Sequence, residues 1–181
     1  MQKKTYHKRR RLLIASIILL MFGFCVIFVI ADQWHLTVAH YDVTTDKLSQ
    51  SVRIVELADL HNKEFGQGNR ELVQKVGGLK PDLIAMTGDM NSDEDSDEQV
   101  VLPLIEQLKK IAPVYYVFGN HELNLQDPDG FAEKIQAAGA VYLKNDMAEI
   151  PVGDKKITIG GLCYYPFYDA FAPDFDNPQR Y

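Results

Sequence analysis

The longest apolar stretch of the chain covers residues 12–31 and contains no charged side chain. As a helix rising about 1.5 Å per residue, it would be about 30 Å long, the thickness of the hydrocarbon layer of a bilayer. Residues 1–11 carry six Lys and Arg and no acid, whereas Asp32 and Trp34 follow the stretch. Because basic flanks stay in the cytoplasm, the pattern predicts a single-pass cell-membrane anchor, a cytoplasmic tail of residues 1–11 and an extracytoplasmic domain of residues 32–181.

Two other interpretations of the apolar stretch remain open. A cleaved signal peptide also has a basic start, but its apolar centre is shorter and a small-x-small cleavage site follows it. The run from Arg9 to Leu13 also resembles a twin-arginine export signal. Since arginines before an apolar segment are ordinary for an anchor, the uncleaved transmembrane helix is the preferred interpretation.

Shorter apolar runs after residue 32 predict strands. These runs either alternate between apolar and polar positions or are continuously apolar. Polar or glycine-containing segments lie before and after each run. The predicted strands cover residues 35–43, 52–58, 83–86, 114–118, 141–143 and 156–162.

Apolar positions three and four residues apart predict helices between these strands. Asn69 is the expected N-cap of the first helix, and Asp127 that of the third, which Gly139 ends. Pro103 predicts a late start or a kink in the second helix. The helices cover residues 71–79, 100–111 and 128–138. Alternation of strands and helices predicts an α/β fold with a sheet that is at least partly parallel.

Polar clusters follow three of the predicted strands directly. In open α/β sheets, functional sites lie outside the carboxyl ends of the strands. If the three strands are neighbours, the side chains converge, and carboxylate, imidazole and amide groups are ligands of divalent metals. Each cluster alone is also compatible with a simple turn, whereas three in succession indicate a site. The candidate residues are Asp59, His61, Asp89, Asn120 and His121.

Charge and cysteine content exclude other classes of function. Residues 32–181 contain 13 basic and 25 acidic residues, a formal charge of −12, so a nucleic-acid partner is not expected. The chain has only two cysteines, which excludes a disulfide scaffold and a cysteine-based zinc finger.

The motifs Ala58-Asp59-Leu60-His61, Thr87-Gly88-Asp89 and Gly119-Asn120-His121-Glu122 occur in this order. From about Ser51 to Leu162, the chain resembles the calcineurin-like metallophosphoesterase family, in particular its bacterial membrane-anchored branch. The resemblance implies a sandwich of two β-sheets flanked by helices, here incomplete and preceded by one transmembrane helix.

The resemblance also implies a mechanism with two divalent metal ions, which could be manganese, iron or zinc. Asp59 and His61 would bind the first metal, Asp89 would bridge both, and Asn120 would bind the second. His121 would protonate or stabilise the leaving oxygen. Metal hydroxide would then attack a phosphoester or pyrophosphate of a phosphorylated small molecule or a lipid-linked substrate.

The chain departs from the family pattern downstream of His121. The family signature continues with further histidines, whereas none follows His121 here. We therefore expect a C-terminally truncated domain with weak activity, because the second metal would keep only Asp89 and Asn120. The alternative function is a truncated, non-catalytic, membrane-anchored module.

Overall fold

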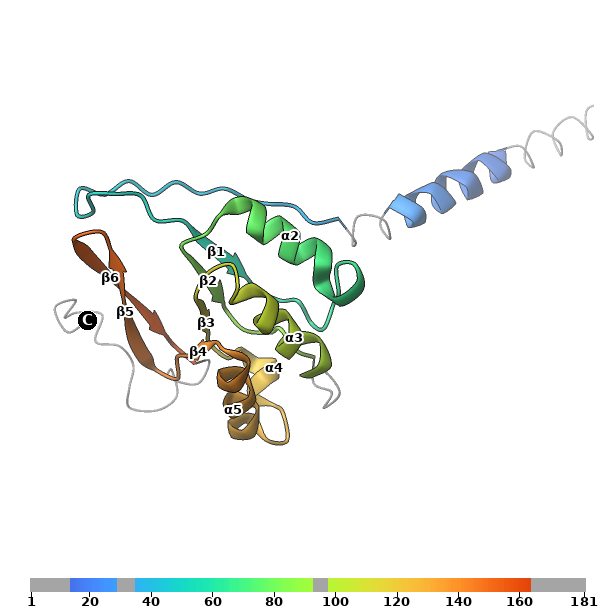
Figure 1. Ribbon diagram of the computed structural model, residues 1–181. Coiled ribbons are helices and arrows are strands. Elements are labelled where there is room, and N and C mark those ends of the chain that lie inside the picture. Colours follow the sequence, from blue (N-terminus) through green and yellow to red (C-terminus); the bar gives the residue numbers. More distant parts are fainter. Residues whose placement is uncertain (1–13, 29–34, 93–97, 164–181) are drawn as a thin grey trace, which may run out of the picture. The chain divides into compact units, whose positions relative to one another are not determined.

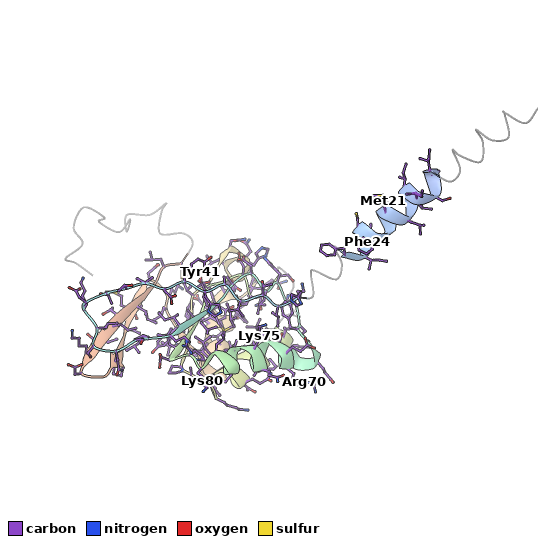
Figure 2. All side chains as sticks on the ribbon, turned by 90° about the horizontal axis from the view of Figure 1, so that it is seen from above. Met21, Phe24, Tyr41, Arg70, Lys75 and Lys80 are labelled. Carbon is purple, nitrogen blue, oxygen red and sulfur yellow. The ribbon has the colours of Figure 1, made fainter. Side chains whose placement is uncertain are left out.

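The computed structural model describes residues 14–28, 35–92 and 98–163, and the chain divides into two units, Met1–Tyr41 and Asp42–Tyr181. In the first unit, residues 14–28 are helical, and Figure 2 shows the exposed side chains of Met21 and Phe24 projecting from this helix. A helix with the length and apolar character to span a bilayer is not found in the described part of the chain.

The predicted tail of residues 1–11 and both ends of the predicted anchor, residues 12–13 and 29–31, lie outside the described residues.

The predicted strand of residues 35–43 is wrong, because this segment has no regular secondary structure. Tyr41 and Val43 are 88% and 90% exposed. A strand is stabilised by hydrogen bonds to a neighbouring strand and by packing of one face, and apolar alternation supplies neither by itself. In the described residues, both sheets are formed without this segment.

The second unit contains a four-stranded parallel sheet in the order β1-β2-β3-β4. Its second strand, β2, is nearly buried throughout and reads Leu-Ile-Ala-Met, the continuous apolar run expected of a parallel strand covered on both faces. The prediction of β2 is confirmed to the residue, and the other strands are shorter than predicted. The four strands are β1 (Ile54–Leu57), β2 (Leu83–Met86), β3 (Val114–Tyr116) and β4 (Val141–Tyr142).

The long helices between these strands are α2 (Arg70–Leu79), α3 (Glu98–Leu108) and α5 (Pro128–Ala138), and the short helices η1 (Gln67–Asn69) and α4 (Asn120–Leu123) precede α2 and α5. Figure 1 shows the long helices together on one side of the sheet, as right-handed crossovers between successive parallel strands require. The central helix, α3, contacts both of the others. It also contains Pro103 in its interior, so the predicted late start is wrong, and the predicted kink stays a prediction.

The ends of the helices test the predicted caps. Asp127 caps α5 by accepting a hydrogen bond from the Gly130 amide at 2.9 Å, and Gly139 ends the helix in the left-handed conformation, as predicted. Asn69 precedes α2 but does not cap it with its side chain. Its Oδ1 atom instead accepts a hydrogen bond from the Phe65 amide at 2.9 Å, so it closes the preceding loop.

An antiparallel hairpin of β5 (Asp146–Val152) and β6 (Lys155–Gly161) forms a second sheet. Figure 1 shows it on the side of the parallel sheet opposite the helices. The sequence predicted β6, within one residue at each end, but not β5. The segment of β5 contains two acids and Pro151, which weaken its strand pattern.

Candidate metal centre

The carboxyl ends of β1, β2 and β3 lie side by side. Leu57 at the end of β1 pairs with Met86 at the end of β2, and Met86 pairs with Tyr116 at the end of β3. Because the strands are parallel and end in register, the segments that follow them leave the sheet at the same edge. The three predicted clusters therefore start from neighbouring positions.

Backbone hydrogen bonds join the segments after β1 and β2. The amide of Asp59 donates to the carbonyl of Gly88 at 3.3 Å, and the amide of His61 donates to the carbonyl of Asp89 at 3.1 Å. Asp59, His61 and Asp89 all have positive φ angles, between 45° and 53°. Such angles are uncommon outside glycine and concentrate at functional sites, where the surrounding structure maintains them.

Gly88 and Gly119 allow the segments after β2 and β3 to approach closely. A Cβ atom at Gly88 would lie 2.4 Å from the Gly119 nitrogen, and a Cβ atom at Gly119 would lie 2.2 Å from Asp89 Oδ1. Gly88 also has a φ of +92°. Both positions thus require a residue without a side chain.

Three of the predicted residues form one cluster. His61, Asp89 and His121 each offer one ligand atom, and these atoms all lie within 4.8 Å of one another. The rings of His61 and His121 meet edge to face, with centroids 4.5 Å apart. Asp89 Oδ1 accepts a hydrogen bond from the His121 amide at 3.0 Å, which orients the carboxylate.

Asp59 borders this cluster, and Asn120 precedes its member His121 in the chain. Asp59 Oδ1 lies 3.9 Å from His61 Nε2, and the Asp59 side chain is 71% exposed. Asn120 is the first residue of α4 (Asn120–Leu123), directly before His121. The division of roles among the five residues stays a prediction. His121 lies within the cluster, so its position also suits a metal ligand, beside the acid role implied by the resemblance.

Glu122 is a functional candidate that the sequence pattern does not single out. Its side chain is fully buried and accepts five hydrogen bonds. One donor is the Tyr116 hydroxyl at 3.0 Å, and burial together with the Glu122 charge raises the pKa of Tyr116 well above its ordinary value. The only signal in the sequence is an acid directly after Gly119-Asn120-His121.

The residues present fit a divalent metal ion. One carboxylate and two imidazoles converge, a second carboxylate lies beside them, and this mixed oxygen and nitrogen set suits manganese, iron or zinc. Hydrogen bonds of the backbone hold the segment of His61 and the carboxylate of Asp89 in place before any ion binds. This order favours binding of the metal ion.

Comparison with known proteins places this site in a family. Residues 52–176 match the family model for the calcineurin-like phosphoesterase. A zebrafish (Danio rerio) protein named "Transmembrane protein with metallophosphoesterase domain" is 26% identical over 118 residues, which are 62% of this chain and 27% of that protein. The Bacillus subtilis protein "Uncharacterized metallophosphoesterase YkoQ" is 27% identical over 120 residues, which are 64% of this chain and 44% of that protein.

The match thus spans less than half the length of these curated relatives. The residues that match the family model, 52–176, include all three motifs that meet at the strand ends, from Asp59 to Glu122. The chain therefore belongs to the calcineurin-like phosphoesterase family.

Proposed function

We propose that this chain carries the metal-binding strand ends of a membrane-tethered phosphoesterase, which uses two divalent metal ions to hydrolyse a phosphoester or pyrophosphate bond. The observation that carries the proposal is the cluster of His61, Asp89 and His121, whose ligand atoms lie within 4.8 Å of one another at the ends of parallel strands. Family membership supports the hydrolase class. The proposed substrate is a phosphorylated small molecule or a lipid-linked phosphate.

Asp59 and His61 would hold the first metal, Asp89 would contact both metals, and Asn120 would hold the second. When bound, two such ions neutralise a phosphate group and lower the pKa of a water molecule that can attack it. The backbone orients the Asp89 carboxylate toward this role, because its Oδ1 atom accepts a hydrogen bond from the His121 amide.

His121 would face the phosphate and donate a proton to the leaving oxygen. Its backbone is held by the bond to Asp89, and its ring contacts the ring of His61. An imidazole next to a metal-held phosphate is suited to general acid catalysis, because it exchanges protons near neutral pH.

Manganese binding tests the proposed function. We expect the 181-residue chain, purified in a mild detergent, to bind Mn²⁺ saturably in isothermal titration calorimetry. Hydrolysis of bis(p-nitrophenyl) phosphate should be weak and should stop on addition of EDTA. Weak turnover is expected because the second metal has few ligands in this chain. Absence of saturable Mn²⁺ binding, or hydrolysis that EDTA leaves unchanged, would contradict the proposal.

The proposed tether is the apolar stretch around the helix of residues 14–28. Its large apolar side chains are exposed, among them Leu19 at 71% and Leu20 at 73%. An exposed apolar surface of this kind is favourable in lipid and unfavourable in water. The zebrafish relative and a Bos taurus relative are both named as transmembrane proteins, which supports a membrane location for this chain.

A topology reporter tests the tether. Alkaline phosphatase fused after Tyr181 should be active in a bacterial host, and green fluorescent protein at the same site should stay dark, because the basic residues before residue 12 retain the N-terminus in the cytoplasm. Replacing the six Lys and Arg of residues 1–11 by Gln should weaken this orientation. Fluorescence together with inactive alkaline phosphatase would refute the topology.

A further inference from the structure

Glu122 is a buried carboxylate in an unusual setting. Its side chain is 0% exposed, and no ion pair with a Lys, Arg or His is formed by it within the described residues. A buried acid without a cation is costly unless its oxygens are fully hydrogen-bonded. The five donors around Glu122 supply these hydrogen bonds. The segments from which the donors come therefore indicate the role of this residue.

The donors come from two different strand ends. Glu122 Oε2 accepts the amides of Asp89 and Gly119, each at 2.9 Å. Glu122 Oε1 accepts the amides of Met90 and Asn91 at 2.8 Å and 3.1 Å, besides the Tyr116 hydroxyl. One carboxylate therefore ties the segment after β2 to the segment after β3.

A further hydrogen bond joins the same two segments, with the acceptor now on the segment after β2. Asp89 Oδ1 accepts the amide of His121, the residue next to Glu122. Asp89 and Glu122 thus bind each other's segments reciprocally, and the Asp89 carboxylate is oriented by a backbone that Glu122 holds. Asp89 has a φ of +52°, a conformation that persists only where its surroundings maintain it.

We propose that Glu122 is a positioning residue of the metal centre: its carboxylate clamps the segments after β2 and β3 and so sets the place of Asp89 relative to His121. This inference rests on the proposed metal-dependent function. The clamp holds the segment of Asp89 next to the segment of Asn120 and His121 before an ion arrives, so the ion does not have to order the proposed ligands Asp89 and Asn120. Weakening the clamp should therefore lower metal affinity.

Glu122→Gln is the informative variant. Glutamine has the same shape, but one of its two ends is an NH₂ group that cannot accept a hydrogen bond. In one orientation this group faces the amides of Asp89 and Gly119, and in the other it faces the remaining three donors. Either way at least two buried or partly buried donors lose their acceptor, and the segments are expected to separate.

Glu56→Gln is the matched control. Glu56 lies exposed on β1 and accepts a hydrogen bond from the Thr87 hydroxyl at 3.1 Å, so the substitution removes the same charge close to the same edge of the sheet. Its side chain takes no part in the clamp. Comparison of the two variants separates loss of negative charge from loss of the clamp.

The experiment measures the dissociation constant of Mn²⁺ for the full 181-residue chain in detergent by isothermal titration calorimetry. Loss of a residue that holds a metal ligand lowers metal affinity by roughly 10–100-fold. We expect a loss of that size for Glu122→Gln and less than about twofold for Glu56→Gln. Equal affinity of the wild type and Glu122→Gln would overturn the positioning role, whereas failure of the wild type itself to bind Mn²⁺ would overturn the proposed function.

Amide hydrogen exchange of the metal-free wild type decides the question if Glu122→Gln does not fold. The amides of Met90, Asn91 and Gly119 donate to Glu122. They should exchange slowly in NMR spectra, since the carboxylate holds them. Exchange as fast as that of the amide of Val43, a residue that is 90% exposed, would show that the clamp does not exist in solution.

Discussion

Replacement of Asp89 by alanine is expected to abolish Mn²⁺ binding and metal-dependent hydrolysis. Asp89 lies at the centre of the cluster, and its carboxylate also accepts the His121 amide hydrogen bond. Since loss of a group that merely holds a ligand costs roughly 10–100-fold in metal affinity, loss of the ligand itself should cost more than about 100-fold. Isothermal titration calorimetry with Mn²⁺ measures this directly.

Two further variants separate the contributions of Asp89. Asp89→Asn keeps an oxygen that can accept the His121 amide but removes the negative charge, so its loss of affinity reports the charge. Asn120→Ala removes a neutral ligand that is proposed to contact one metal, and its loss should be smaller than that of Asp89→Ala. Equal, small losses in Asp89→Ala and Asn120→Ala would refute the bridging role of Asp89.

Replacement of Gly88 by alanine is expected to destabilise the domain strongly. The new Cβ atom would lie 2.4 Å from the Gly119 nitrogen and 2.7 Å from the Gly119 Cα, at a φ of +92°. Neither segment can retreat easily, because Glu122 accepts hydrogen bonds from both Asp89 and Gly119. Overpacking and backbone strain each cost about 1–3 kcal/mol. We therefore expect a loss of about 3 kcal/mol and a fall in Tm of roughly 6–12 °C.

Gly78→Ala is the control for this substitution. Gly78 lies in α2, has no positive φ, and a Cβ atom there would meet no atom within 4 Å. Alanine in a helix is more stable than glycine by about 0.5–1 kcal/mol, so Gly78→Ala should leave Tm unchanged or raise it. A thermal melt followed by circular dichroism distinguishes the two variants. Equal melting temperatures of Gly88→Ala and the wild type would show that the close approach is not maintained in solution.

Local chemistry was sufficient to predict several elements from the sequence. The strand β2 was predicted to the residue because four consecutive apolar residues between Asp82 and Thr87 favour a buried strand. The start and end of α5 follow from Asp127, Pro128 and Gly139, whose preferences act within one helical turn. The order of the three polar motifs likewise identified Asp59, His61, Asp89, Asn120 and His121 as candidates.

Features that depend on distant partners were decided only by the tertiary structure. Residues 35–43 have the alternation of a strand but belong to neither sheet of the described residues, whereas the charged segment of β5 pairs with β6 along its whole length. Strand pairing depends on which neighbour supplies hydrogen bonds, and this neighbour is not encoded in the segment itself.

Glu122 gives the clearest example of this difference. In the sequence it is an acid in a polar motif, and acids are ordinarily exposed. In the structure it is fully buried, because four backbone amides and one hydroxyl from two strand ends converge on its oxygens. The sequence therefore determined which groups can bind a metal. The packing of three parallel strands determined which of them meet, since only that packing brings segments about 30 residues apart within hydrogen-bond distance.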